Sequence, residues 1–97
     1  MNLRNLARGQ QCRIRIPGIC THNPEQTVLA HFRLGGLCGT GMKPHDLIGA
    51  DACAACHDAV DGRRATQFSR DELRLMHAEG VMRTISARME SLKVVKA

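Results

Sequence analysis

Large aromatic side chains are almost missing from this 97-residue chain, which has no tryptophan, no tyrosine and only two phenylalanines, Phe32 and Phe68. Proteins that bind single-stranded nucleic acid commonly stack bases on aromatic rings, so this scarcity argues against a binder of that kind. It also leaves few large side chains for a hydrophobic core. A domain of this length with such a core is expected to need a further cross-link, such as a metal ion or a disulfide.

Long hydrophobic runs are also absent, so the sequence predicts no membrane-spanning segment. Residues 1–11 form a polar, basic lead-in that lacks the apolar stretch of a signal peptide. We therefore expect a cytoplasmic protein in a reducing compartment. In that setting, five cysteines in a short chain are expected to bind metal before they form disulfides.

Acidic residues are outnumbered by basic ones, which gives a net charge of +5. Eleven of the fourteen basic residues are arginines, whose planar guanidinium groups pair with two phosphate oxygens at once. The charge suggests nucleic acid as a partner. A solvated basic surface without a partner explains it equally well.

Hydrophobic periodicity predicts two short strands. Apolar and basic residues alternate over 12–16, and a second strand is expected at 27–32. Residues 34–46 contain four glycines and are expected to form a loop. Residues 51–65 should enter a helix near Cys56.

A long helix is predicted over residues 69–95. Ser69 can cap its first turn, and Glu72 completes a capping box. The helix could wrap the core or pair with a second copy of the chain as a homodimer, and its methionines are expected to fill the core. Its apolar stripe consists of Leu73, Met76, Val81, Met82, Ile85, Met89 and Leu92.

The cysteines suggest a structural zinc site. Cys53 and Cys56 form a CxxC motif, whose spacing lets both sulfurs bind one ion. A tetrahedral site needs two more ligands, and Cys12 and Cys20 are expected to supply them because a Pro-Gly turn folds the chain back between them.

Two alternatives stay open at this zinc site. Cys38 or His22 could replace one member of the second cysteine pair; otherwise Cys38 is expected to be a free thiol. The cysteines could also be small buried side chains that bind no metal.

A second metal site is predicted beside the zinc motif. His57 directly follows the CxxC motif, and Asp61 lies four residues later. Positions i and i+4 share one face of a helix, so these two side chains can bind one divalent ion together. His31, at the end of the second predicted strand, has no evident structural role and is a candidate catalytic residue.

These residues carry a family resemblance. The segments AHFR (30–33), KPHD (43–46) and CAACH (53–57) stand in the order of an HNH, or ββα-metal, nuclease motif. Over most of its length the chain is similar to the YbcO family of small prophage-encoded proteins. The CxxCH half is the specific part of the resemblance.

The resemblance implies a role for each matching residue. His31 would be the general base that activates water, and His57 and Asp61 would be ligands of the catalytic metal. This chain departs from the HNH pattern at two places. Ala30 stands where many members have an Asp or His as a metal ligand. The usual middle asparagine is not in its place; Asp46, slightly farther upstream of His57 than the pattern has it, is the nearest candidate ligand.

Phosphodiester hydrolysis also needs cations that neutralise the phosphate. Arg33 lies two residues beyond His31 on the predicted strand, so it would point to the same side and clamp a phosphate during catalysis. The remaining candidates for contacting the nucleic-acid backbone are Lys43, Arg63 and Arg64. The resemblance implies Mg²⁺ or another divalent ion as the catalytic cofactor.

We therefore predict one α+β domain spanning residues 1–97. A zinc-stapled ββα-metal unit would occupy 12–64, and the long helix at 69–95 would pack across it. The expected function is metal-dependent endonuclease cleavage of DNA, and the resemblance implies a role in prophage DNA processing or recombination. The alternatives are a zinc-binding DNA or protein adaptor with a degenerate HNH site, and a phage-encoded regulator acting through the long helix.

Overall fold

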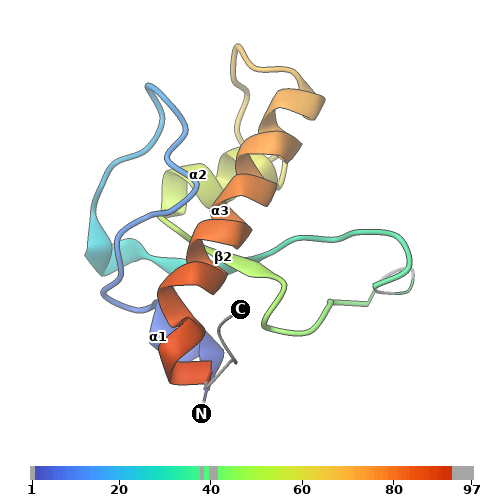
Figure 1. The fold of residues 1–97 in the computed structure, drawn as a ribbon. Coiled ribbons are helices and arrows are strands. Elements are labelled where there is room, and N and C mark those ends of the chain that lie inside the picture. The colour runs from blue at the N-terminus through green and yellow to red at the C-terminus, as the bar shows by residue number, and fades with distance from the viewer. Residues whose placement is uncertain (1, 38, 40–41, 93–97) are drawn as a thin grey trace.

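The computed structural model describes residues 2–37, 39 and 42–92 of the chain. The fold is α+β, with a two-stranded sheet and a long C-terminal helix, as the sequence predicts (Figure 1). The elements in chain order are α1 (Leu3–Ala7), the 3-10 turn η1 (Pro24–Gln26), β1 (Val28–His31), β2 (Gly49–Ala52), α2 (Ala54–Val60) and α3 (Arg70–Leu92). None of the helices in these described ranges combines the length and the hydrophobicity needed to cross a membrane.

The sheet is an antiparallel pair in which Ala30 of β1 lies opposite Ala50 of β2, and His31 lies opposite Gly49. β1 falls within the strand predicted at 27–32, so that prediction is confirmed. Nothing in the sequence pattern indicates β2. All four of its residues are buried, so the strand lacks the alternation of apolar and polar residues that marks a half-exposed strand. The order of elements is therefore β1, β2, α2, with the CxxC motif at the junction of β2 and α2.

The strand predicted at residues 12–16 does not form, and that prediction is wrong. Its two isoleucines are still buried, so the alternation reflects burial without a strand. Arg15 has a φ of 58°, which interrupts the extended backbone that a strand requires. The segment instead runs as an irregular loop, held to β2 by a 2.7 Å hydrogen bond from the Arg13 N–H to the Asp51 carbonyl.

The N-terminal lead-in at residues 1–11 contains a helix that the sequence analysis did not predict. The side-chain oxygen of Asn2 caps α1 by accepting hydrogen bonds from the backbone N–H groups of Arg4 and Asn5, at 3.0 and 3.3 Å. Ala7 is fully buried, and α1 packs against β1. The lead-in therefore belongs to the folded structure.

The capping box predicted at the start of α3 is confirmed. The Ser69 N–H donates to a Glu72 carboxylate oxygen at 2.8 Å, and the Glu72 N–H donates to the Ser69 hydroxyl at 3.1 Å. The helix continues to Leu92, whereas positions 93–95 of the predicted range lie outside the described residues. Figure 1 shows α3 crossing the sheet, and its packing is mainly on β2.

The inner face of α3 differs from the predicted apolar stripe. Val81 is buried as expected, but Met82 and Met89 are exposed, so the prediction that the methionines fill the core is wrong for these two. Gly80 lies so close to the loop at residues 12–16 that a Cβ at this position would come within 2.9 Å of the Ile14 side chain. Met82 and Met89 lie two and nine residues after Gly80, on the opposite side of the helix, and so face outward. Pairing of α3 with a second copy of the chain stays a prediction.

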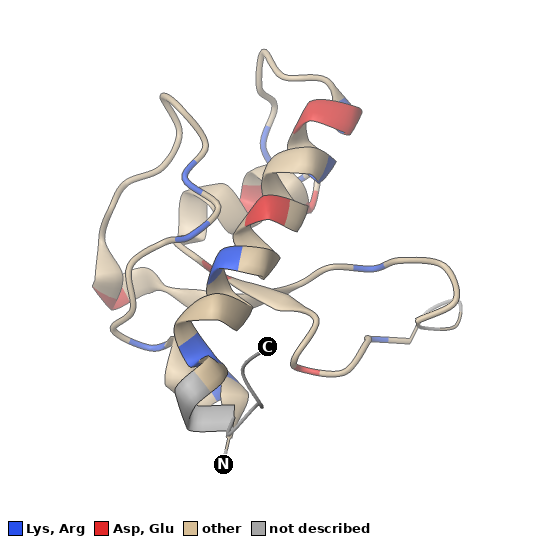
Figure 2. Ribbon diagram, viewed as in Figure 1, with Lys and Arg blue, Asp and Glu red and all other residues tan. Residues whose placement is uncertain are grey.

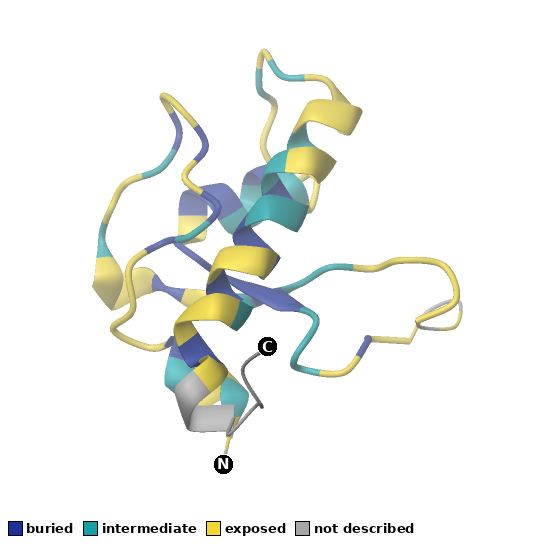
Figure 3. Ribbon diagram, in the orientation of Figure 1, coloured by how far each residue is buried: buried dark blue, intermediate teal, exposed yellow. Residues whose placement is uncertain are grey.

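A buried ion network joins α3 to the sheet. The side chain of Asp51 is fully buried, and Arg88 donates to its two carboxylate oxygens at 2.6 and 2.9 Å. Arg13 contacts the same carboxylate, and the Asp51 N–H donates to the Thr84 hydroxyl at 3.0 Å. Buried positions gather where α3 crosses β2 (Figure 3), so this network lies within the core that positions the β2–α2 junction.

Candidate active site and metal centre

Four cysteines from separate parts of the chain converge on one point. The sulfurs of Cys12, Cys20, Cys53 and Cys56 all lie within 4.8 Å of one another, and those of Cys20 and Cys53 are 3.9 Å apart. A tetrahedral zinc ion with Zn–S bonds of about 2.3 Å needs sulfurs roughly 3.8 Å apart. The arrangement therefore fits the predicted ligand set and a structural zinc ion.

Local backbone geometry explains why these sulfurs meet. The Pro-Gly turn reverses the chain between Cys12 and Cys20 as predicted, with the Cys20 N–H donating to the Ile16 carbonyl at 3.0 Å. At the other pair, the sulfur of Cys53 caps α2 by accepting a hydrogen bond from the Cys56 N–H at 3.4 Å. The motif thus starts α2 at Ala54, two residues before the predicted entry.

The four thiols influence one another's ionisation. A hydrogen bond from the Cys56 thiol lowers the pKa of Cys12 to about 4, and the same contact raises the pKa of Cys56. Burial raises the pKa of Cys20 to about 11. Ionisation of one thiol therefore hinders that of its neighbours, and a bound divalent cation would let all of them ionise together.

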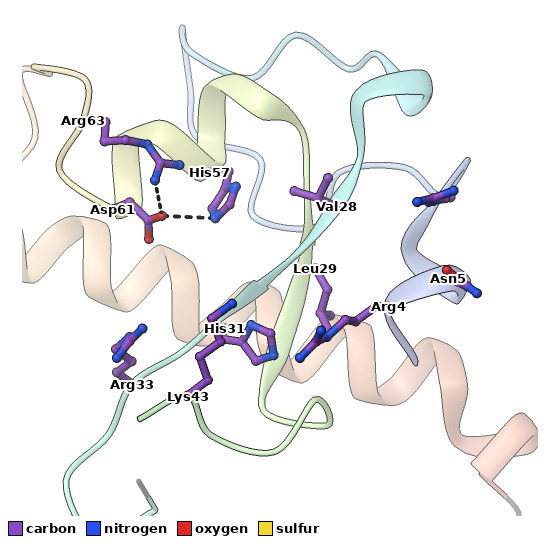
Figure 4. A pocket seen from close by; sticks show the side chains of 11 residues that line it. Arg4, Asn5, Val28, Leu29, His31, Arg33, Lys43, His57, Asp61 and Arg63 are labelled. Atoms are coloured by element: carbon purple, nitrogen blue, oxygen red, sulfur yellow. Dashed lines mark ion pairs between the residues drawn. The ribbon is translucent and has the colours of Figure 1, made fainter. Parts of the chain in front are cut away.

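A cleft of about 480 Å³ lies between α1, β1 and α2 (Figure 4). Two histidines line it, His31 from β1 and His57 from α2. Basic residues are spread over α1, the loops and α3 (Figure 2), and five of them line this cleft. These five cations are Arg4, Arg8, Arg33, Lys43 and Arg63.

His31 forms a pair with an aspartate from the loop that precedes β2. Its Nε2 lies 2.8 Å from Oδ1 of Asp46, and the same oxygen accepts a hydrogen bond from Nε of Arg4 at 3.2 Å. The hydrogen bond from His31, and then the one from Arg4, hold the pKa of Asp46 below its usual value of 3.8. Because an ionised carboxylate can only accept, the Nε2–H of His31 donates the hydrogen bond to Asp46.

His57 and Asp61 form the predicted pair on one face of α2 and its C-terminal cap. Nε2 of His57 lies 3.1 Å from Oδ2 of Asp61, which also accepts from Nη1 of Arg63 at 3.0 Å. In the part of the chain that the structure describes, only the cysteine cluster brings three or more metal-binding side chains together. The pair therefore offers two protein ligands at one edge of the cleft.

A family model described as "Putative nuclease YbcO" matches residues 1–93 of the chain. The chain belongs to the YbcO family. Among its relatives in this family, proteins named "Putative nuclease YbcO" from Escherichia coli strain K12 and "Putative nuclease ybcO" from Enterobacteria phage 82 are each 63% identical to it over 62 residues. Each alignment covers 64% of this chain, which spans 65% of the length of either relative.

A solved structure has a similar fold. It is described as "Structure of a putative bacteriophage protein from Escherichia coli str. K-12 substr. MG1655" and is 38% identical, with a TM-score of 0.75. The match covers 94% of this chain and the whole of that one. The arrangement of α1, the sheet and α3 is therefore shared with a solved bacteriophage-related structure.

Apart from the cysteines, most of the predicted site residues of this YbcO-family chain line the cleft. His31, Arg33, Lys43 and Arg63 line it together with the His57 and Asp61 pair. Arg64 is exposed but is not part of the lining. Asp46 lies against His31 and apart from the predicted metal pair, and Cys38 lies outside the described residues.

The sequence analysis missed the contribution of α1 to this YbcO-family cleft. Arg4, Asn5 and Arg8 line its edge opposite α2. A sequence signal was present, because Asn2 is a favourable helix cap and the two arginines stand four residues apart, a spacing that favours one side of a helix. His22, considered as a replacement zinc ligand, lies 3.6 Å from the Cys20 sulfur through Nδ1 but is not a member of the four-sulfur group.

Proposed function

We propose that this chain is an endonuclease that hydrolyses phosphodiester bonds of DNA with a divalent metal ion. The observation that carries the proposal is the His31–Asp46 pair, which lies at the edge of a cleft lined by five cations. Phosphodiester hydrolysis needs a base that activates water, cations that neutralise the phosphate and stabilisation of the departing oxygen. The nuclease name of the relatives agrees with this chemistry.

His31 would act as the general base through the ring nitrogen that Asp46 does not use. Because the Asp46 carboxylate is ionised, it accepts a hydrogen bond from the Nε2–H of His31 and so favours the tautomer with an unprotonated Nδ1. Nδ1 would then take a proton from the attacking water. Asp46 is therefore a positioning residue for the base in this proposal, in place of the metal-ligand role considered from the sequence.

His57 and Asp61 would hold the catalytic divalent ion. Mg²⁺ commonly binds through one or two carboxylates and completes its shell with waters and substrate phosphates, which suits Asp61, whereas the imidazole of His57 suits a transition-metal ion. When bound, such an ion polarises the phosphate and stabilises the departing oxygen. Arg33, Lys43 and Arg63 would neutralise the phosphates beside the scissile bond and hold the strand in the cleft.

The zinc ion proposed at the four cysteines would be structural. All four positions of a tetrahedral shell are taken by sulfur, which leaves no position for water or substrate. Its role would be to hold the start of α2, and so the position of His57, directly after Cys56. Ligation would thereby connect the stability of the fold to the geometry of the cleft.

A cleavage assay tests this function directly. Wild-type protein should nick or linearise plasmid, or cut a branched junction or single-stranded DNA, in Mg²⁺ or Mn²⁺. His31→Ala should lose about 10²–10⁴-fold in rate while it keeps its zinc content, its circular dichroism spectrum and its DNA affinity. Added imidazole, which supplies a base in solution, should restore part of the rate. A His31→Ala protein that cuts as fast as wild type would exclude His31 as the base.

A zinc-binding DNA adaptor is the second candidate function. It is favoured by the metal pair at His57 and Asp61, which gains no third acidic or histidine ligand among the described residues. Such a protein would bind DNA through the same five cations without cutting it. Salt-dependent binding combined with no cleavage of any DNA form, in any divalent ion, would select this function over the nuclease.

A further inference from the structure

Arg4 and His31 share one oxygen of Asp46. Oδ1 accepts from Nε2 of His31 at 2.8 Å and from Nε of Arg4 at 3.2 Å. Arg4 uses Nε for this contact, and in the described part of the chain its two terminal nitrogens have no protein partner. They are therefore available for a second anion, and the shared oxygen is the point at which Arg4 and His31 influence each other.

The Arg4–Asp46 ion pair is of a kind that is easily exchanged. The side chain of Arg4 is 60% exposed and that of Asp46 is 31% exposed, and solvent-exposed ion pairs contribute little to stability. The buried Arg88–Asp51 pair is different. Arg88 contacts both oxygens of the fully buried Asp51, and its departure would leave that buried charge without this partner. A phosphate offers Arg4 a doubly hydrogen-bonded partner in place of a single contact.

Arg4 also stands where bound nucleic acid would pass. It lines the cleft that contains His31, and it lines a second hollow of about 310 Å³ together with His45 and Asp46. Figure 4 shows Arg4 reaching from α1 toward the side of the cleft where His31 lies. Among the described residues, Arg4 is the one that the two linings share, so a polynucleotide strand that runs from one hollow to the other would pass Arg4.

We propose that Arg4 exchanges Asp46 for a backbone phosphate of bound nucleic acid, and that this exchange leaves the shared oxygen of Asp46 to His31 alone. The inference rests on the proposed function, because it assigns Arg4 a role at the same site. Arg4 is then both a substrate contact and a positioning residue that acts on the base through Asp46. In this proposal, Oδ1 of Asp46 accepts a hydrogen bond from His31 alone only when substrate lies in the cleft.

Histidine ¹⁵N NMR tests the exchange without requiring cleavage. The protein is titrated with a short DNA duplex, with no added divalent ion and no chelator, so that zinc stays bound. In Arg4→Gln, the His31 ring signals of the free protein should be displaced toward those of DNA-bound wild type. Arg8→Gln is the matched control, because Arg8 lines the same cleft from α1 but has no carboxylate partner among the described residues. Coincidence of the free Arg4→Gln and free wild-type His31 signals would overturn the proposal.

Salt dependence of binding tests the phosphate contact. The slope of log affinity against log salt should decrease by about 0.9 in Arg4→Gln, as expected for one lost contact to B-DNA. An unchanged slope would show that Arg4 does not contact phosphate.

In cleavage assays, KM for DNA should rise about tenfold in Arg4→Gln, with a smaller change in kcat, as expected for the loss of one charge-assisted contact. Asp46→Asn should instead act mainly on kcat.

Failure of the nuclease proposal is distinguishable from failure of this one. If wild-type protein cuts no DNA, the nuclease function is wrong, but the NMR titration and the salt slope still decide whether Arg4 leaves Asp46 for phosphate. If wild type cuts DNA and Arg4→Gln loses kcat as severely as Asp46→Asn, Arg4 is a fixed part of the base's support and the exchange is wrong.

Discussion

His77 of α3 donates a hydrogen bond from Nε2 to the carbonyl oxygen of Ala30 at 2.9 Å, one residue before His31. The His77 ring also packs edge-on against Phe32, at 5.0 Å between ring centroids, so α3 contacts the residues on both sides of His31. The long helix thereby fixes the strand that carries the proposed base. A contact between residues 47 positions apart in the chain sets the position of the site.

Stability should fall with decreasing pH because of His77. Burial lowers the pKa of His77 below its usual 6.5, so the unfolded chain takes up a proton near pH 6.5 that the folded chain resists. The stabilisation is fully present above that pH and is lost as pH falls through the lower folded pKa. Thermal melting between pH 7.5 and pH 5 should show the decline.

Two substitutions separate the effect of the His77 proton from that of its hydrogen bond. His77→Gln keeps an N–H donor for Ala30 but cannot titrate, so its melting temperature should fall less between these pH values than that of wild type. His77→Ala also leaves the Ala30 carbonyl without its donor, which should cost about 1–3 kcal/mol at neutral pH. Protonation of the cysteines also lowers stability at low pH, and it does so equally in all three proteins. The prediction therefore concerns the difference between them, and a pH response in His77→Gln equal to that of wild type would contradict it.

Zinc content should depend on the four clustered cysteines. Elemental analysis should find one zinc per chain in wild type, and Cys53→Ser or Cys56→Ser should unfold the protein, because ligation supplies folding energy. Cys38→Ser provides the comparison and should keep zinc and fold. A chelator-resistant, folded protein without zinc, or loss of zinc in Cys38→Ser, would show that the proposed ligand set is wrong.

Removing one partner of the buried Asp51–Arg88 pair should destabilise the fold strongly. Arg88→Met leaves the carboxylate of Asp51 without the donor that contacts both of its oxygens, and such a loss costs about 3–5 kcal/mol. Arg63→Met is the control, because Arg63 is 56% exposed and its ion pairs should contribute only about 0–1 kcal/mol. Urea unfolding measures both, and equal losses would mean that burial does not govern these pairs.

Metal dependence should distinguish the His57–Asp61 pair from His31. His57→Ala and Asp61→Ala each remove a proposed ligand, so higher Mg²⁺ or Mn²⁺ should restore part of their cleavage rate. Extra metal should not restore His31→Ala, which lacks the base. Asp58→Ala is the control, since Asp58 follows His57 on the same helix but does not line the cleft. Rescue of His31→Ala by metal alone would contradict the division of roles.

Local patterns predicted the parts of the site that depend on short-range geometry. The CxxC spacing and the Pro-Gly turn indicated the four-cysteine cluster, and the i, i+4 spacing indicated the contact between His57 and Asp61. The pairing of His31 with Asp46 spans 15 residues and a glycine-rich loop, and no periodic pattern records the path of such a loop. The sequence therefore predicted Asp46 only as a possible metal ligand, and the pairing with His31 was not predicted.

By itself, the sequence determined which residues could ligate metal, bind phosphate or accept a proton, because these are properties of side chains and of short spacings. The tertiary structure decided which of them meet. Arg4 reaches Asp46 across 42 positions only because the buried Ala7 holds α1 against β1. The strand β2 exists because its small, buried residues fit beneath α3, and packing of that kind leaves no alternation in the sequence to read.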